Sequence, residues 1–323
     1  MGKGKKNVSS SEAGVPKKQH GDWAKSAVKD CHLEGLKKDG LVPEGVRHPG
    51  SEVIPRPRPG ERVSFVDFAI RGLSFPVHEF FRGLLYAYGV QIHHFTPNAI
   101  LHIACFITLC ECFLGVNPHW GLWKRIFFVK RQTVWKGGRS LATGGFGIQV
   151  RADVEYFNLR LVESVQGWRK RWFYVDSEST PGQSSLPEFS ADALVHKKRT
   201  WRHDLTTEEE AEANRLLAQV SALQTTPGKE VTRVQLISTF LRRRVQPLQA
   251  RLHAMWGYDG PNDLTRTRRV DFSDDELEYH VKMITAIPKT EPCALTLLVK
   301  PYGEGNWLPK VRPFPLLFSF ILF

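Results

Sequence analysis

One stretch of this sequence, from Phe75 to Arg131, constrains the fold more than any other. It is dense in aromatic and aliphatic residues, with few charges between them. Such a stretch must be buried, because exposing so much apolar surface to water is unfavourable. A membrane span would need roughly 20 uninterrupted apolar residues, whereas His102 and Glu111 interrupt this run. The sequence therefore predicts the interior of a folded domain and no membrane partner.

Residues typical of helix starts and ends divide this stretch into three predicted helices. Pro76 favours the first turn of one helix, where a missing N–H costs little. A second helix is expected from Pro97 to Gly115, apolar on all its sides. The third is expected from Pro118 to Phe128, because the basic pair Lys130 and Arg131 favours a helix C-terminus.

The same residues show a family resemblance. The blocks are RPRPGERVSFVDFAIRGLSFPVHEFFRGLLYAYGVQIHHF, PNAILHIACFITLCECFLGVNPHWGLWKRIFFVKR, GWRKRWFYVD and FLRRRVQPLQARLHAMWGYDGPNDLTR. Together they resemble the plant gypsy-type transposon domain family, retroelement-derived proteins labelled transposases, from about Trp23 to Ile287. The resemblance implies a transposable-element-derived protein and supplies no active site.

The rest of the chain predicts a small β element and further helices. Phe146, Ile148 and Val150 alternate as in a half-buried strand. Glycines between 137 and 147 are expected at hairpin and bulge positions, since neither a Gly-Lys-Ser/Thr ending nor a G-x-G-x-x-G motif is present. The fold class is therefore expected to be mainly α, a helical core with a small antiparallel β element, α+β overall.

Three helices are expected in the C-terminal half. Thr206 with Glu209, and Ser273 with Glu276, are typical capping boxes at helix starts. Between them, apolar residues from Val231 to Val245 recur at helical spacing.

Composition divides the chain into five predicted parts. They are a disordered basic arm at 1–21, a helical core with the β element at 22–175, a linker at 176–190, a C-terminal helical region at 191–287 and a Pro-rich irregular tail at 288–323.

Charge and cysteine content suggest partners and a compartment. The formal net charge of +12 favours contact with DNA or RNA, although a basic protein without such a partner has the same charge. The five cysteines are odd in number and sit mostly in apolar context, which is typical of free thiols in a reducing compartment. No apolar segment follows the basic N-terminus, so no secretory signal is expected. The predicted location is intracellular, in nucleus or cytoplasm.

Two basic segments are candidate nucleic-acid-binding sites. In an extended strand, Trp168, Arg169, Lys170, Arg171 and Trp172 would mix rings and cations on both faces. Rings can stack on bases and cations can neutralise phosphates. The alternative is an ordinary strand whose rings pack on the helical core while its cations stay in water.

The second segment is a run of arginines on the predicted helix around residue 240. Arg242, Arg243 and Arg244 lie opposite its apolar stripe and could contact phosphates. Such a run is also typical of a solvated helix face.

Metal and catalytic sites are not expected. His102, Cys105, Cys110 and Cys112 are zinc-ligand types, but their spacing matches no zinc motif and they point around the whole predicted helix. Buried small apolar residues are the preferred interpretation. No carboxylate stands in a context that indicates a two-metal site. We expect no metal, no cofactor and no small-molecule ligand.

These observations lead to one functional hypothesis and two alternatives. The leading one is a non-catalytic, element-derived protein that binds nucleic acid or self-associates as a gag-like assembly module. The alternatives are a metal-dependent transposase or integrase, and a decayed open reading frame without activity.

Overall fold

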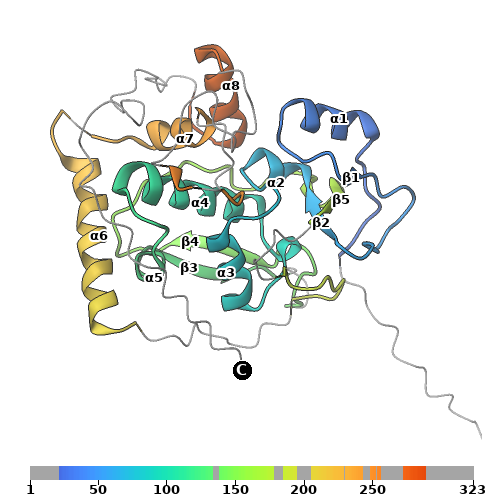
Figure 1. The fold of residues 1–323 in the computed structure, drawn as a ribbon, viewed down its shortest axis with the longest axis horizontal. Helices are drawn as coiled ribbons and strands as arrows, with labels where there is room; N and C mark the ends of the chain where they lie inside the picture. Colours follow the sequence, from blue (N-terminus) through green and yellow to red (C-terminus); the bar gives the residue numbers. More distant parts are fainter. Residues whose placement is uncertain are drawn as a thin grey trace, which may run out of the picture.

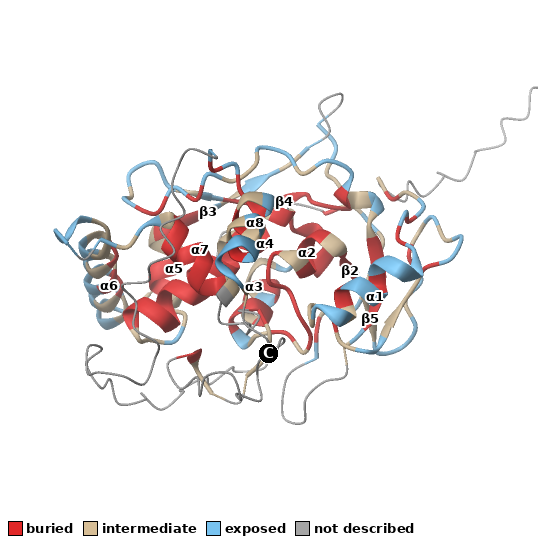
Figure 2. Cartoon of the chain, turned by 90° about the horizontal axis from the view of Figure 1, so that it is seen from above, coloured by how far each residue is buried: buried red, intermediate tan, exposed pale blue. Residues whose placement is uncertain are grey.

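The computed structural model describes residues 22–133, 138–177, 185–194, 205–228, 230–242, 248–251, 253–255 and 272–288. The predicted basic arm and all but the first residue of the predicted tail lie outside these ranges. In Figure 1 helix α4 runs through the middle of the molecule, with α7 and α8 on one side of it and the strands β3 and β4 on the other. Helix α6 (Thr207–Thr225) stands at one end, and α1 (Asp30–Lys38) stands at the opposite end with the strands β1 (Val46–Arg47), β2 (Glu61–Phe65) and β5 (Trp172–Asp176) (Figures 1 and 2).

The α-helices of the described residues are α1 (Asp30–Lys38), α2 (Val66–Ile70), α3 (Glu79–Tyr88), α4 (Pro97–Thr108), α5 (Trp120–Ile126), α6 (Thr207–Thr225), α7 (Arg233–Arg242) and α8 (Asp274–Ile284). The strands are β1 (Val46–Arg47), β2 (Glu61–Phe65), β3 (Phe127–Arg131), β4 (Phe146–Val150) and β5 (Trp172–Asp176). Short 3₁₀ turns lie at Ile92–His94 and Trp168–Lys170. The predicted α+β class is confirmed.

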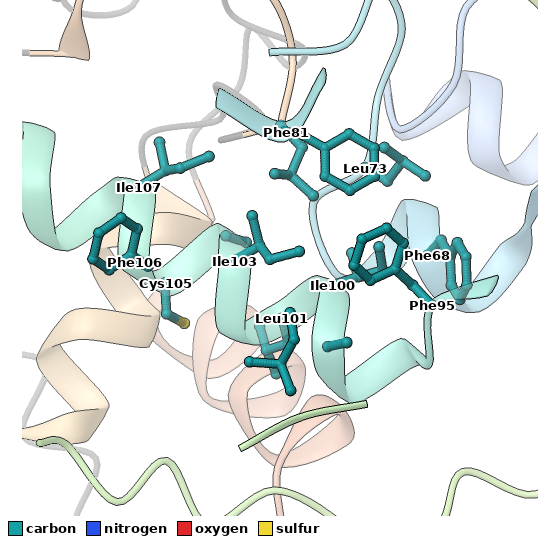
Figure 3. Close-up of a cluster of buried hydrophobic side chains, with 14 of the residues drawn as sticks. Phe68, Leu73, Phe81, Phe95, Ile100, Leu101, Ile103, Cys105, Phe106 and Ile107 are labelled. Atoms are coloured by element: carbon teal, nitrogen blue, oxygen red, sulfur yellow. The ribbon is translucent and has the colours of Figure 1, made fainter. Parts of the chain in front are cut away.

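Helix α4 forms the centre of the core. It starts as predicted, because Pro97 occupies the first turn and the Thr96 hydroxyl accepts the Ala99 N–H at 3.1 Å. Figure 3 shows Phe68, Leu73, Phe81 and Phe95, which come from outside this helix, on the side of it that carries Ile100 and Ile103. Only Asn98 and His102 of the helix are not buried. The helix is thus enclosed by the rest of the chain.

The central helix continues beyond α4 as a π-helix, Leu109–Leu114. It ends at Gly115, the predicted stop, where φ is +66°. Among the helices that the structure describes, this continuous span, Pro97–Leu114, is the one that is long and apolar enough to cross a membrane, and 89% of it is buried inside the fold.

Two details of the predicted helices are wrong. Pro76 lies outside α3, whose N-cap is His78. The third helix ends at Ile126, and Lys130 and Arg131 lie in β3 instead of at a helix C-terminus. Aromatic and β-branched residues at 127–129 favour a strand, and β4 satisfies its backbone groups.

The strands form two small antiparallel sheets. One has the order β1-β5-β2, so β5 lies between two strands that precede it by more than a hundred residues. The other is the two-stranded ribbon β3–β4, in which Val129 pairs with Ile148. Phe146 and Ile148 are buried and Gln149 is exposed, as the predicted alternation in β4 requires, whereas Gly147 is also buried and Val150 is half-buried.

The C-terminal helices pack against the central part of the fold. Both predicted capping boxes are present, at Thr206 with Glu209 and at Ser273 with Glu276. Helix α6 packs on α5, and α7 packs on both α4 and α8. A single cluster of buried apolar residues runs from Trp23 to Ile287, so the described residues on both sides of the predicted linker share one core.

Candidate nucleic-acid interface

The first predicted site, residues 168–172, folds differently from the extended strand that its composition indicated. Gly167, with φ of +70°, starts a 3₁₀ turn over Trp168–Lys170, and the strand begins only at Trp172. The predicted alternation of faces is therefore wrong at the start of this segment.

Both indoles of this segment belong to the core. Trp168 is 5% exposed and its ring centroid lies 4.8 Å from that of Phe65 and 5.4 Å from that of Phe68. Trp172 is fully buried and donates its indole N–H to the carbonyl of Ala24 at 2.9 Å. Neither ring face is presented at the surface for a base.

The cations of the same segment stay near the surface. Lys170 is exposed. The Arg169 Nε donates to the carbonyl of Thr143 at 3.2 Å and lies 3.3 Å from the carboxylate of Asp22, which itself accepts two N–H groups of the loop before β4. Arg171 makes a bidentate pair with Asp67, at 2.9 and 2.7 Å.

Asp67 pairs with a second cation. Arg71 is 4% exposed at its side chain, and one of its terminal nitrogens lies 3.5 Å from the Asp67 carboxylate. Burial lowers the pKa of Arg71, and the neighbouring charge of Asp67 opposes that effect. The guanidinium groups of Arg71 and Arg171 thus share the single carboxylate of Asp67. These three groups together carry a net positive charge, next in sequence to Lys170.

The second predicted site has little described structure. Arg242 is the last residue of α7, and its side chain lies outside the described residues, as do Arg243 and Arg244. The structure therefore does not place these three guanidinium groups.

A third basic region escaped the sequence analysis. Residues 112–152 contain no Asp and no Glu but carry seven cations, namely Lys124, Arg125, Lys130, Arg131, Lys136, Arg139 and Arg151. This interval includes α5, β3 and β4 and supplies much of the net charge of the chain. A local count of acidic residues would have found it.

The β3–β4 ribbon has an inner and an outer face. Phe127, Val129, Phe146 and Ile148 point inward, and β4 packs beside α4. The outer face carries Phe128, which is 36% exposed and stands opposite Gln149, and Lys130, which stands opposite Gly147. We call Phe128, Lys130, Gln132 and Gln149 the ribbon face.

Gln132 belongs to the ribbon face because its side chain lies over Gly147, which has no side chain of its own. A Cβ placed on Gly147 would lie 3.0 Å from the side-chain nitrogen of Gln132, so the amide group covers the outer side of that glycine. The ribbon face therefore offers one aromatic ring, one ammonium group and two carboxamides, and no acidic group.

Further cations surround the ribbon face. Arg139 and Arg151 are exposed at the two ends of the hairpin. Arg125 is partly exposed and approaches Glu210 of α6 at 3.9 Å. Arg169 contacts the loop before β4 through Thr143, so one cation of the predicted 168–172 site lies at the base of the ribbon. Figure 2 shows β3 and β4 along one side of the core, beside α4.

The candidate metal ligands lie inside the core. Cys105, Cys110 and Cys112 are buried free thiols, and burial raises the pKa of Cys105 and of Cys110. Burial also lowers the pKa of His102 to about 4. Within the described residues no three His, Cys, Asp or Glu side chains are grouped as a metal site requires.

The fold and the ribbon define an α+β protein with a basic β-ribbon on a helical core. Residues 63–131, from β2 to the end of β3, match the family model described as Putative gypsy type transposon. This segment, about a fifth of the chain, identifies a transposon-derived protein with a gypsy-type transposase domain. No curated protein and no solved structure matches the chain.

Proposed function

We propose that this transposon-derived protein binds nucleic acid through the ribbon face and the cations around it. The observation that carries the proposal is the acid-free interval 112–152, whose described cations lie on and around the antiparallel ribbon β3–β4. Lys and Arg side chains displace counterions condensed on phosphates, which favours association with any nucleic acid.

The charges around the ribbon favour a nucleic-acid-binding surface over a basic surface that contacts only water. Exposed cations in proteins commonly lie near acidic side chains, and such surface ion pairs contribute little to the stability of the fold. Strands β3 and β4 themselves carry no acidic residue. Among the described cations around the ribbon face, Arg169 lies 3.3 Å from Asp22 and Arg125 lies 3.9 Å from Glu210. The positive potential is therefore available to a polyanion.

The experiment is a salt titration of binding with the purified full chain. Fluorescence anisotropy with labelled DNA and RNA oligonucleotides should show affinity that falls steeply from about 50 to 200 mM salt. The variant Lys130→Glu should weaken binding and flatten the salt dependence. Lys38→Glu is the matched control, because it is an exposed lysine on α1, at the other end of the molecule (Figure 1).

Two results would contradict the proposal. One is binding that is absent or insensitive to salt. The other is an equal loss of affinity in the ribbon variant and in the Lys38→Glu control, which would indicate an effect of net charge alone.

The earlier candidate residues need different variants. Since Trp168 and Trp172 are buried, replacing them tests folding rather than contact with a base. Lys170→Glu tests that site without disturbing the core, and Arg242, Arg243 and Arg244 can be replaced together by Gln. The gag-like assembly role and the metal-dependent transposase stay predictions, and light scattering and a divalent-metal cleavage assay on the same preparation would test them.

A further inference from the structure

We infer that the ribbon face prefers single-stranded nucleic acid to a duplex, an inference that rests on the proposed function. The feature that distinguishes the two ligands is the exposed ring of Phe128. A phenylalanine ring carries no hydrogen-bonding group for a phosphate or for a base edge. Stacking on an unpaired base gives it a large apolar contact directly, whereas insertion into a duplex must first unstack a base step, which costs free energy.

The ring of Phe128 is partly exposed, although the adjacent residue of the same strand is buried in the core. Phe127, its neighbour, is 2% exposed and packs at 4.4 Å, centroid to centroid, from the ring of Trp123. Alternation along β3 sends Phe128 to the opposite side. The sequence therefore places one aromatic ring inside and presents the next one to water, on the face that also carries Lys130.

The spacing of the ribbon face suits an extended strand of nucleotides. Phe128 and Lys130 are two residues apart on one face, which corresponds to about 6.8 Å along a β-strand. A base stacked on Phe128 thus has an ammonium group within reach of its backbone phosphate. Gln149 stands directly across from Phe128, where its amide can donate to and accept from the edge of the same base.

Gly147 keeps the space beside the ring free of a bulky side chain. It stands opposite Lys130 and diagonal to Phe128, and a Cβ placed on it would lie 3.0 Å from the side-chain nitrogen of Gln132 and 3.1 Å from the carbonyl oxygen of Lys130. A residue with a side chain at this position would have to displace that amide. Gly147 therefore adds no side chain to the outer side of the ribbon, and the planar amide of Gln132 is the side-chain group that covers it.

The test compares one sequence as single-stranded DNA, single-stranded RNA and duplex DNA, at fixed salt, with the full chain. We expect tighter binding to the single strands. Phe128→Ala should reduce single-strand affinity by about 5- to 150-fold, the range for loss of one stacked base, and should leave duplex affinity nearly unchanged. Phe128→Tyr, which keeps the ring, should retain the preference, and thermal unfolding of each variant confirms that it is folded.

The outcomes separate this inference from the proposed function. Duplex binding as tight as single-strand binding, or an equal loss for both ligands in folded Phe128→Ala, overturns the single-strand preference while leaving nucleic-acid binding intact. Absence of salt-dependent binding to all three ligands overturns both.

Discussion

Arg251 places its guanidinium group on the carboxylate of Glu111, and the side chains of these two residues are only 3% and 2% exposed. Glu111 lies in the π-helix, within the family segment, whereas Arg251 lies far beyond it in the chain. His78 contacts the other carboxylate oxygen at 3.2 Å. The backbone adds to this junction, because the N–H of His78 bonds to the carbonyl of Leu248 and the N–H of Ala250 to that of Pro76. The segment 248–251 is thereby fixed to the central helices.

Replacing Glu111 by Gln should destabilise the protein strongly. The substitution leaves the Arg251 charge buried without a carboxylate, and removal of one partner of such a pair costs about 3–5 kcal/mol. Urea unfolding followed by tryptophan fluorescence measures the change. The double variant Glu111→Met with Arg251→Met should cost less than the single one, since it leaves no buried charge. A single variant within about 1 kcal/mol of the natural protein would show that the pair is not desolvated.

Trp168→Ala should act on folding. Its indole packs between Phe65 and Phe68, so its removal leaves a cavity that costs about 3–5 kcal/mol. Lys170→Ala, two residues away and exposed, should change stability by about 0.5 kcal/mol or less. Thermal unfolding of the two variants side by side measures this difference, and equal melting temperatures would contradict the burial of Trp168.

Gly144→Ala should cost more than Gly138→Ala. Both glycines have positive φ, +65° and +61°, so each substitution costs about 1–2 kcal/mol in backbone strain. At Gly144 an added Cβ would lie 2.5 Å from a ring carbon of Trp168, whereas nothing lies within 4 Å of one at Gly138. The clash should add about 1–3 kcal/mol. The difference between the unfolding free energies of the two variants, measured by chemical denaturation, gives the cost of the clash. Equal losses of stability would show that the loop around Gly144 shifts away from Trp168 without cost.

His94 should make the protein less stable in mild acid. Burial lowers its pKa from 6.5 to about 4. Between these values the unfolded chain binds a proton at this imidazole and the folded chain does not, so stability falls as the pH drops from 6.5 to 4. The slope for one such group is up to about 1.4 kcal/mol per pH unit.

The variant His94→Asn tests this directly. The Nδ1 of His94 accepts the N–H of Gln91 at 3.0 Å, and the side-chain oxygen of Asn can accept the same hydrogen bond. Unfolding free energies measured from pH 4 to pH 7 should depend less on pH in the variant, by about one proton. Burial also lowers the pKa of His93 and of His102, so part of the dependence should remain. An unchanged slope would contradict the burial of the imidazole of His94.

Local signals predicted three helix starts correctly and one wrongly. Pro97, Thr206 with Glu209 and Ser273 with Glu276 stand at the starts of expected helices, because a start signal is formed by residues close in sequence, whereas Pro76 lies outside α3. The helical core was predicted for a similar reason, since the apolar stretch can be accommodated only in an interior.

The strands and the proposed nucleic-acid surface depend on distant residues, so the sequence predicted them less well. Trp172 is buried because β1 and β2 flank β5, and no short window contains those partners. Lys130 and Arg131 could end a helix or form a strand edge, and pairing with β4 decides between the two. The acid-free interval was visible in the sequence, but exposure of Phe128 on one face follows only from that pairing.

The position of β5 between β1 and β2 has a consequence for how the protein is made. As the ribosome releases the chain from its N-terminus, β1 and β2 emerge long before residues 172–176 and must wait for the strand that joins them. During that interval their backbone edges are bare and open to pairing with a neighbouring nascent chain. A polypeptide cut down to residues 63–131 would keep only residues 63–65 of β2, without β5, and would keep β3 without β4. The segment that matches the family model therefore needs residues outside it to complete both sheets.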